Sequence, residues 1–509
     1  MSAASALHGA LVLLALSACQ SVLGIQDLSE EPRPGAPGAG GTDGSGEPTA
    51  VDTPAPVGTG GTGETGASPA ARDNPQPGPA GTSTPSPAPL SDAGAPDAVA
   101  PTPGITVAGR VIDFFRRPVP DTVVSIGAST AITDADGRFS IADVTPPYTA
   151  SFVATVFLTG GQGRYGYVYE GLTREDPTLQ TYSVLPARGA SSLVTTYPNT
   201  TFDTGRFTMV AFGTPDGARF SDDEATNGTE YVGTPNWSGP ASTTGFIHAL
   251  LCTRADTFDP PNGYEAHQAV PLTVTDNAQG SAIFDNLPLG SLTSGMLGGN
   301  VSGGVLGART NYIALRFSDG SAMPIIDEGA AGAAFQYLVP DIAGASFVVG
   351  AADGTSAFPP YAVAHRENIA FGASDVALAI PRPVTLQSPQ NGDPNVTPST
   401  PYGWSAVSQT AQTFLWHLEF DNTFEGMFVL TSSTQIELPT FADGFTVPQS
   451  VAVTWSVETH GDAPSVDAVA GPDGYLDAFS LGETYPIGPN GADGYYTESE
   501  RRGFVMGAD

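Results

Sequence analysis

The sequence of 509 residues predicts an all-β fold, with serial β-sandwich domains after a disordered tether. Two observations predict this fold. From about residue 105 onward, apolar residues alternate with polar ones or form runs of about four to eight positions, and Gly, Pro, Asn and Asp separate the runs. Helical periodicity does not persist over about three turns anywhere in the body. Short strands with turn residues between them are typical of β-sandwiches.

The clearest expected strands are short segments rich in β-branched and aromatic residues, which fit a half-buried pleated surface. Turn residues lie between them. They are Val123–Ile126, Phe139–Ile141, Gly166–Tyr169, Ser346–Val349 and Val451–Trp455.

The N-terminus carries a short apolar run, Ala10–Leu16, which is followed by Ser17-Ala18-Cys19. A membrane span needs about 20 apolar residues, so this run is the core of a signal peptide rather than a span. The small residues before the cysteine resemble a bacterial lipobox. The resemblance implies that residues 1–18 are a lipoprotein signal peptide. It also implies that lipidated Cys19 is the mature N-terminus, with a diacylglycerol and an N-acyl chain such as palmitate.

Two further observations bear on this anchor. Gln20, rather than Asp, follows Cys19. In lipoproteins of Gram-negative type this implies sorting to the outer membrane, with a periplasmic or surface-facing body. Residues 1–9 contain no Lys or Arg, although a signal peptide usually has a positive n-region. A plain secretory signal, in which Cys19 has no special role, therefore stays open as the alternative.

Residues 19–104 are expected to be a disordered tether. From residue 30 to residue 104 the chain is a tract of Gly, Pro, Ala, Ser and Thr with scattered acids and almost no aliphatic bulk. Such a segment cannot bury enough apolar surface to offset the entropy of ordering it. As a flexible coil, the stretch from Cys19 to Gly104 would span on the order of 50 Å, which would hold a folded body away from a lipid surface.

The charge balance is strongly acidic. The chain has 52 Asp and Glu residues against 18 basic residues, all of them Arg, and its formal net charge is −34. A nucleic-acid-binding protein would present a basic face, so the composition argues against nucleic acid as a partner. Of the two cysteines, Cys19 and Cys252, a lipidated Cys19 could not form a disulfide. Cys252 ends an apolar run and is expected to be a buried thiol.

Residues 105–186 form the clearest unit of the body. The pattern runs from Gly109-Arg110-Val111 through Pro118-Val119-Pro120 and Thr133–Ile141 to Pro146-Pro147-Tyr148. It resembles the carboxypeptidase regulatory-like domain, a small transthyretin-like β-sandwich. The resemblance implies a folding or interaction module without catalytic residues of its own.

Within this unit, Asp134–Gly137 could be a calcium loop or a tight turn. A calcium loop of the EF-hand type needs Glu at the twelfth position, where this chain has Thr145. Asp caps its own backbone in turns, and Gly accepts a positive φ. The segment is therefore predicted to be a turn.

Residues 187–381 are expected to be β-rich, as one region or as two small sandwiches. Thr275–Gly280, followed by Phe284–Pro288, repeats the turn–strand–turn pattern of the preceding unit and favours a second related sandwich. Gly298–Gly304 is expected to be a loop, and it is not a phosphate-binding loop because no helix follows it. Trp237 lies in a loop-rich stretch. An exposed Trp there could bind a ligand by stacking on a sugar ring, although Trp is more often interior.

Residues 382–509 form the last unit. It begins with Leu386-Gln387-Ser388-Pro389, has Trp404 early, and ends in an expected closing strand, Arg502–Val505. This order resembles a fibronectin type III or immunoglobulin-like β-sandwich. One set of alternate residues between 414 and 420 is aromatic or aliphatic, and that face of the strand is expected to be buried: Phe414, Trp416, Leu418 and Phe420. His417, on the other face, is expected to face solvent.

No arrangement of residues identifies a catalytic or metal site. The histidines are scattered, without the H-x-x-x-H or H-E-x-x-H spacing of metal sites, and no G-x-S-x-G motif is present. Glu458, His460 and Asp462 could bind a metal, but a surface cluster is the simpler interpretation. The sequence therefore predicts no catalytic residues, no metal and no cofactor.

These observations favour a non-enzymatic, surface-tethered lipoprotein with a binding, adhesion or scaffold role in the cell envelope. Its partners would be the membrane, through lipidated Cys19, and envelope proteins or polysaccharide. Two alternatives stay open. One is an accessory protein that binds polysaccharide, for which Trp237 is the candidate contact. The other is a hydrolase with an unrecognised site in residues 187–380.

Overall fold

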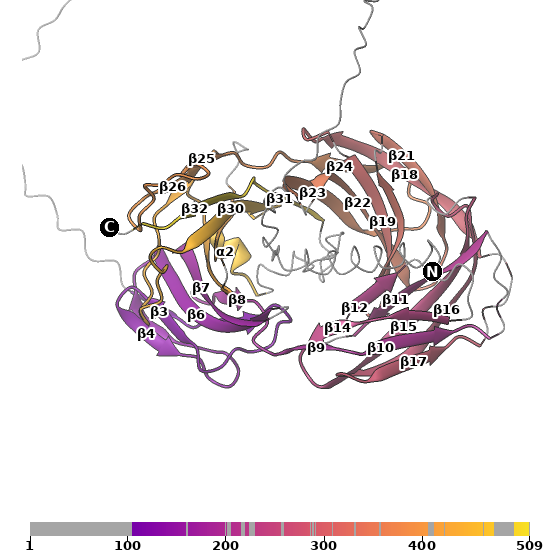
Figure 1. Ribbon diagram of the computed structural model, residues 1–509, viewed down its shortest axis with the longest axis horizontal. Coiled ribbons are helices and arrows are strands. Elements are labelled where there is room, and N and C mark those ends of the chain that lie inside the picture. The colour runs from indigo at the N-terminus through magenta and orange to yellow at the C-terminus, as the bar shows by residue number, and fades with distance from the viewer. Residues whose placement is uncertain are drawn as a thin grey trace, which may run out of the picture. The chain divides into compact units, whose positions relative to one another are not determined.

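The computed structural model describes residues 104–507, apart from 159–160, 199, 201–204, 215–218, 223–229, 256–258, 286, 288–289, 291, 308, 330–331, 356–357, 406–411, 422, 462 and 473–492. Within these residues the fold is all-β, which confirms the fold class predicted from the sequence (Figure 1). The described residues include a short helix, α2 (Val466–Val469). No helix in this part of the chain is long and apolar enough to cross a membrane. The predicted signal peptide, Cys19 and residues 19–103 of the predicted tether lie outside the described residues.

The first sandwich places a sheet of order β7-β6-β3-β4 over two short ladders, β1-β5 and β2-β8. Its strands are β1 (Ile105–Val107), β2 (Arg110–Asp113), β3 (Val123–Ile126), β4 (Ser129–Ile132), β5 (Ile141–Val144), β6 (Tyr148–Leu158), β7 (Gly161–Leu172) and β8 (Thr178–Thr181). The core between the layers includes Val111, Phe152 and Tyr167, all of them buried. β3 coincides with a predicted strand, whereas the strand predicted to start at Phe139 begins only at Ile141.

The segment Asp134–Gly137 is a turn, as predicted. The carboxylate Oδ1 of Asp134 accepts hydrogen bonds from the backbone N–H groups of Asp136 at 2.9 Å and Arg138 at 2.8 Å. Gly137 has a φ of 70°. The side-chain cap and the left-handed glycine are the two features on which the prediction rested.

Residues 187–381 contain one seven-stranded arrangement twice, as two successive copies. The strands of the first copy are β10 (Ser192–Thr196), β11 (Arg206–Gly213), β12 (Arg219–Asp222), β13 (Glu230–Gly233), β15 (Ser242–Thr253), β16 (Gly263–Thr275) and β17 (Gln279–Ile283), and β9 (Ala187–Gly189) and β14 (Asn236–Ser238) extend one of its sheets. Those of the second copy are β18 (Ser294–Gly303), β19 (Arg309–Phe317), β20 (Ala322–Gly329), β21 (Ala334–Pro340), β22 (Ala345–Thr355), β23 (Phe358–Ile369) and β24 (Val376–Ile380).

Strand order and register show that the two copies correspond. β10 lies between an antiparallel β13 and a parallel β17, and β18 lies in the same way between β21 and β24. The facing sheets run β16-β15-β11-β12 and β23-β22-β19-β20. Ala211 is opposite His248 in the first copy, and Ala314 is opposite Val348 in the second. The same fold is therefore used twice in succession.

The glycine-rich segment Gly298–Gly304 is not the loop expected from the sequence, because it belongs to β18 up to Gly303. A Cβ on Gly299 would lie 2.0 Å from the carbonyl oxygen of Val376 on β24. Glycine in a strand interior often marks such a close approach of another backbone. The glycines here permit strand pairing rather than a flexible turn.

The C-terminal sandwich packs a sheet of order β25-β26-β29 against one of order β31-β30-β27-β28, and β32 also pairs with β30. Its strands are β25 (Leu386–Ser388), β26 (Tyr402–Trp404), β27 (Phe414–Phe420), β28 (Glu425–Thr431), β29 (Gln435–Ile436), β30 (Ala452–His460), β31 (Gly494–Glu498) and β32 (Arg502–Val505). Trp404, Trp416 and Trp455 are buried in its core. As expected, β27 buries one alternating face there, and β32 forms at the predicted closing strand.

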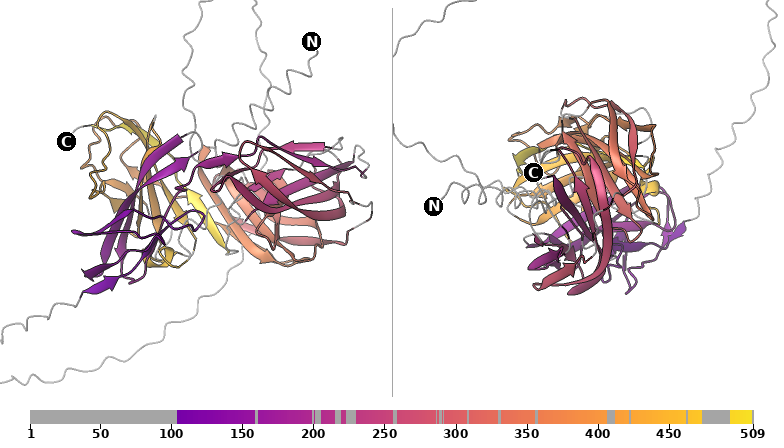
Figure 2. Two further views of the ribbon diagram at one scale, coloured as in Figure 1. Left: turned by 90° about the horizontal axis from the view of Figure 1, so that it is seen from below. Right: turned by 90° about the vertical axis from the view of Figure 1, so that its right-hand side faces the viewer.

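Strands of the C-terminal sandwich join two other units edge to edge. β28 pairs in parallel with β7, from Gly426 opposite Tyr165 to Leu430 opposite Tyr169. β31 pairs antiparallel with β23, which belongs to the second copy. A continuous 13-stranded sheet results, and Figure 2 shows its first strands, in indigo, beside those of the C-terminal sandwich. The order of units in this sheet therefore differs from their order in the chain.

Candidate functional site

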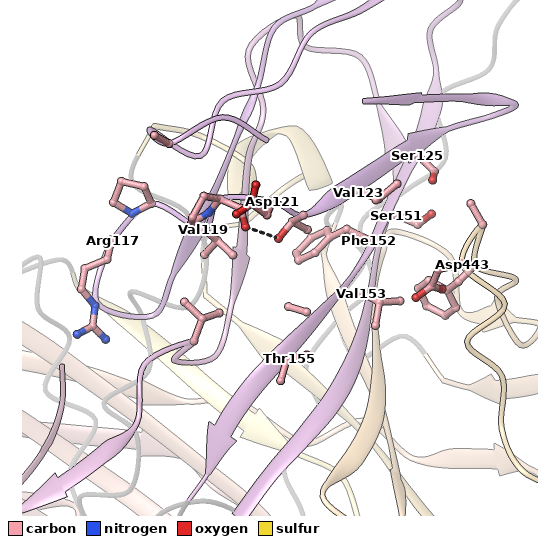
Figure 3. A pocket seen from close by; sticks show the side chains of 18 of the residues that line it. Arg117, Val119, Asp121, Val123, Ser125, Ser151, Phe152, Val153, Thr155 and Asp443 are labelled. Carbon is pink, nitrogen blue, oxygen red and sulfur yellow. Dashed lines mark hydrogen bonds between the residues drawn. The ribbon is translucent and has the colours of Figure 1, made fainter. Parts of the chain in front are cut away.

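A groove opens where two neighbouring strands of the first sandwich differ in length. β3 pairs with β6 only from Val124 opposite Phe152 to Ile126 opposite Ala150, whereas β6 continues to Leu158. The groove, shown in Figure 3, has a volume of about 690 Å³. It is lined by β6, by the segment before β3 and by residues 441–443 of the C-terminal sandwich.

The lining of the groove mixes hydroxyl, apolar and charged side chains. Ser151, Val153 and Thr155 alternate along β6 with the core residues Phe152 and Ala154, so their side chains lie on the face opposite the core. Four valines and Leu185 contribute most of the apolar lining, together with two prolines before β3. The surface is suited to recognition by shape and hydrogen bonding.

The cationic side chain of the groove is held by partners. Arg117 forms an ion pair with Asp113 at 2.8 Å and donates to the backbone oxygen of Ser238 at 2.6 Å and to Ser183 Oγ at 3.2 Å. Burial raises the pKa of Asp113, although Arg117 opposes this shift. Arg117 thus ties the first sandwich to β14 of the next unit and fixes one end of the groove.

The acid at the opposite end is also paired. Asp443 lies 2.5 Å from the guanidinium of Arg164, and the same guanidinium lies over the ring of Phe445, 5.1 Å from its centroid. Asp121, between the two ends, is exposed. The two ion pairs fix the side chains of Arg117 and Asp443 at the ends of the groove. The carboxylate of Asp121 stays exposed at its rim.

A second polar arrangement joins the two copies. His248 Nε2 lies 2.8 Å from Asp319 Oδ2, and His248 Nδ1 lies 3.2 Å from His267 Nε2. An ionised carboxylate can only accept, so His248 donates to Asp319, and the other ring nitrogen of His248 shares a hydrogen bond with His267. Ser321 donates to Asp319 from its hydroxyl at 2.6 Å. The result is a chain of hydrogen bonds from carboxylate to imidazole to imidazole.

Electrostatics shifts the pKa values of two members of this chain, Asp319 and His267. Burial raises the pKa of Asp319, but hydrogen bonds from His248 and Ser321 outweigh it, so the net shift is downward. Burial, with a smaller contribution from His248, lowers the pKa of His267 to about 4. Both imidazoles stack on Phe317, with ring centroids 3.7 Å and 5.3 Å away. The arrangement is a polar contact between the two copies.

A third set of titratable groups lies on the face of β27 and β30 opposite the tryptophan core. Glu458 is directly opposite Glu498, and Glu498 accepts from Arg501 Nε at 2.7 Å. Burial, and then the charge of Glu498, raises the pKa of Glu458 well above its ordinary value. Burial also raises the pKa of Glu419 to about 7. Burial therefore favours the protonated forms of Glu419 and Glu458.

His417 belongs to this set, and the expectation that it faces solvent is wrong. Its ring stacks on Phe428, 4.2 Å away between centroids, and burial lowers its pKa to about 3. β28 and the aromatic residues of β7 continue the sheet beyond it. A strand face that looks polar in the sequence is covered here because another sandwich lies next to it.

The surface cluster favoured for Glu458 and His460 is wrong, because His460 is buried, and the two residues do not form a metal site in the described part of the chain. Glu458 and His460 lie 3.5 Å apart, and Asp462 lies outside the described residues. Across the described part of the chain, no group of three or more His, Cys, Asp or Glu side chains is placed to hold a metal ion.

The structure corrects the sugar-stacking role considered for Trp237. The indole is 4 % exposed and packs in the core of the first copy, and its Nε1 donates to the backbone oxygen of Pro240 at 2.8 Å. A sugar ring cannot reach a face that neighbouring side chains cover. Trp237 lies on β14 because its residues bridge β9 and β12, a pairing that its turn-rich surroundings did not indicate.

One of the two cysteines, Cys252, lies in the described residues. Cys252 is fully buried, as predicted, and burial raises the pKa of its thiol well above the ordinary value. A thiol with a raised pKa is a weak nucleophile. Cys19, the predicted lipidation site, lies outside the described residues.

Sequence reasoning did not find the groove or the Asp319–His248–His267 chain. The groove depends on β3 ending its pairing while β6 continues, and neither end point has a sequence signal. The proline pair before β3 is the nearest signal, because proline cannot donate to a ladder. Asp319 and His248 are 71 positions apart, so only the packing of the two copies brings them together.

Comparison with known proteins does not identify a family. No protein-family model and no curated protein matches the chain. Among solved structures it is similar to the Bacillus anthracis TIE protein, with 9% identity and a TM-score of 0.15 over 54% of this chain and 50% of that one. The chain thus spans about half the length of that protein.

Two further solved structures are similar over different shares of the chain. A tetra-tandem repeat from the extending region of a large adhesion protein has 10% identity and a TM-score of 0.13, over 79% of this chain and 99% of that one. A DUF3823 family protein from Bacteroides uniformis has 13% identity and a TM-score of 0.11, over 34% and 100%. TM-scores of this size carry no argument about function.

Proposed function

We propose that this protein is a non-enzymatic, lipid-anchored binding or scaffold protein of the bacterial outer membrane, and that the groove beside β6 is its binding surface. The observation that carries the proposal is the groove. It combines hydroxyl and apolar lining groups, while Arg117 and Asp443 are held in ion pairs. Such a surface favours recognition rather than acid–base chemistry, which needs titratable groups free to exchange protons.

The anchor rests on the lipobox-like end of the signal peptide at Cys19. One acyl chain gives marginal membrane binding, and two or more hold a protein durably, because each buried methylene contributes about 0.8 kcal/mol. Gln20 favours the outer membrane as the destination. The tract of residues 30–104 has the composition of a flexible spacer between the lipid and the sandwiches.

Replacement of Cys19 tests the anchor. The full-length protein should partition with outer membranes and carry acyl mass on Cys19, whereas Cys19→Ala should lose both. Cys252→Ala is the matched control, since that thiol is buried and its loss should leave the partition unchanged. Membrane fractionation and intact-mass spectrometry measure the two properties. Wild-type protein found soluble with an unmodified Cys19 contradicts the anchor.

A hydrolase is the second candidate, and the Asp319–His248–His267 chain is the observation that favours it. A carboxylate that orients an imidazole is a recurring part of hydrolytic sites, and this one lies within residues 187–380. The third member here is His267 rather than a serine or cysteine nucleophile. Hydrolysis of ester, peptide or glycan substrates by the wild type, lost in His267→Gln, would support this candidate over the first.

A further inference from the structure

The hairpin of β22 and β23 extends past its neighbouring strands at one end of the second copy. The described pairs of β19 with β22 end at Asp353, and those of β31 with β23 begin at Tyr361. Thr355 and Phe358 are opposite each other beyond both of these points. The side chain of Phe358 is 77 % exposed, although large apolar side chains are usually buried. The hairpin therefore presents an aromatic ring at its projecting end.

The loop that follows β18 is held against this hairpin by a buried carboxylate. Asp353 accepts hydrogen bonds from the backbone N–H groups of three successive residues, which are Val305, Leu306 at 2.6 Å and Gly307 at 2.9 Å. Gly304 has a φ of 75°, and a Cβ there would lie 2.9 Å from Oδ2 of the carboxylate. A carboxylate that accepts three backbone donors fixes the loop in one conformation.

The fixed loop places a second exposed apolar side chain beside the ring. Leu306 packs over the hairpin, because a Cβ on Gly354 would lie 2.9 Å from its Cδ1. Val305, the residue before it, is 51 % exposed. Val305, Leu306 and Phe358 thus lie at the same end of the second copy, and together we name them the apolar tip.

The apolar tip lies in uncharged sequence. Neither Ser302–Gly307 nor Phe358–Pro360 contains Asp, Glu, Lys or Arg, although the chain has a formal net charge of −34. Single exposed apolar residues are common on protein surfaces, whereas neighbouring ones mark contact sites with proteins or membranes. A projecting end without charges is therefore a candidate contact site.

We propose that the apolar tip inserts its side chains into the surface of the phospholipid bilayer that carries the anchor. The inference rests on the proposed function, in which Cys19 is acylated. Aromatic and aliphatic side chains gain free energy where the headgroups meet the acyl chains, and charged side chains lose it. The contact gives the tethered body a second attachment to the lipid, and with it a defined orientation.

Two observations favour lipid over a protein as the occupant. The stretch from Cys19 to Gly104 spans on the order of 50 Å as a flexible coil. The body thus stays near the lipid, where tethering raises the effective concentration and a weak contact is enough. The 52 acidic residues against 18 basic ones favour basic protein partners, but the apolar tip has no charge with which to pair them.

A dye on the apolar tip tests the contact in the anchored, full-length protein. Val305→Cys and Phe358→Cys each add one accessible thiol, because Cys252 is buried and an acylated Cys19 has no free thiol. Each variant is labelled with a nitrobenzoxadiazole dye and reconstituted through its acyl chains into phosphatidylcholine vesicles. Spin-labelled phosphatidylcholine should quench the dye at either position. An unquenched dye at both positions would overturn the inference.

Phe371→Cys is the matched control, because this partly exposed ring lies at the opposite end of the same copy. It follows β23, whose 12 residues begin at Phe358, so the two ends are about 40 Å apart. A dye at residue 371 should stay unquenched. Equal quenching at residues 305, 358 and 371 would contradict insertion of the apolar tip.

Vesicle flotation reports on the anchor separately. Protein that floats with the vesicles while its dye stays unquenched contradicts the insertion and leaves the anchor standing. Protein that does not float contradicts the anchor, and the insertion with it.

Removal of the ring tests its share of the contact. In the labelled Val305→Cys protein, Phe358→Ser should lower the quenching at least about fivefold, because the ring supplies most of the apolar area that leaves water. Phe371→Ser in the same protein should leave the quenching unchanged. Circular dichroism checks that both variants are folded. Undiminished quenching in folded Phe358→Ser would contradict the role of the ring.

A second copy of the chain is the competing occupant. It would cover the dye without lipid, so the emission would shift to the blue as the protein density on the vesicles rises, without quenching by the spin-labelled lipid. That result would overturn the inference. Replacement of part of the phosphatidylcholine by anionic phosphatidylglycerol should weaken the quenching, because the acidic body is repelled by an anionic surface.

Discussion

Single residues on the sheet face of β27 and β30 give the protein an unusual set of buried titratable groups. His417 keeps its neutral form because burial disfavours the imidazolium, and its pKa falls to about 3. Glu419 keeps its proton up to about pH 7 for the same reason. The two shifts act on stability in opposite senses. The histidine disfavours the folded state in acid, and the carboxyl disfavours it as the pH rises.

The effect of His417 can be separated by mutation. Below its ordinary pKa of about 6.5 the unfolded chain binds a proton on this histidine, whereas the folded chain does so only near pH 3. Stability is therefore lost as the pH falls through this window. Between pH 7 and pH 5 the loss from this group is about 2 kcal/mol, and His417→Asn should remove that part of the pH dependence.

Urea unfolding followed by tryptophan fluorescence measures this prediction, because three tryptophans lie in the C-terminal core. Ser456→Ala is the control, since Ser456 is directly opposite His417 on β30 and does not titrate. The free energy of unfolding of Ser456→Ala should differ between pH 7 and pH 5 by the same amount as in the wild type. If the free energy of unfolding of His417→Asn falls between pH 7 and pH 5 as much as that of the wild type, the histidine is protonated in the folded protein.

At the scale of elements, glycines in β18 show how a strand can be built from residues that disfavour strands. Gly299 lies so close to β24 that a Cβ would collide with a carbonyl oxygen. The parallel pairing of β18 with β24, which closes the sheet of the second copy, therefore depends on the missing side chain.

Gly299→Val should disrupt this pairing and destabilise the second copy by about 3 kcal/mol or more, because the clash is with backbone that cannot rotate away. Gly290→Ala is the matched control, since a Cβ there meets no atom within 4 Å, and it should leave stability nearly unchanged. Thermal unfolding by calorimetry compares the two. A Gly299→Val protein as stable as the wild type would mean that the strands can separate without loss.

Elements with local signals could be predicted from the sequence, and elements set by distant partners could not. Alternation placed β3 and the aromatic face of β27, and the Asp–Gly pattern placed the turn at Asp134, because each depends on near neighbours in the chain. The strand at Gly299 was missed because its stability comes from β24. The burial of Trp237 and His417 was missed because strands far along the chain cover them.

Less of the candidate site than of the fold could be predicted from the sequence. A groove made by the unequal reach of β3 and β6 is a property of pairing, and pairing partners are not encoded in periodicity. The lipidation site at Cys19, by contrast, is a local pattern that sequence alone can propose.

At the scale of the whole molecule, the C-terminal sandwich holds other units together. It supplies β28 to the edge of β7 and β31 to the edge of β23. Its helix α2 also adds Val466 and Val469 to the core of the first sandwich. The stability of the folded body should therefore depend more on residues 382–509 than on residues 30–104, the tract that precedes the body in the chain.

Two deletions test this dependence. Removal of residues 382–509 should leave the edges of β7 and β23 open and should lower the melting temperature of the remainder or cause it to aggregate. Removal of residues 30–104, a tract with almost no aliphatic bulk, should change the melting temperature by no more than a few degrees. Calorimetry and size-exclusion chromatography compare the two proteins. A stable monomer without residues 382–509 would contradict the role of the C-terminal unit.

The parallel pairing of β28 with β7 also imposes an order on folding. The two strands are about 260 residues apart, so a chain that emerges from its N-terminus exposes β7 long before β28 is available to pair with it. Until β28 arrives, the tyrosine-rich edge of β7 is an open template for another strand. Completion of the C-terminal sandwich therefore closes an edge at the other end of the folded chain.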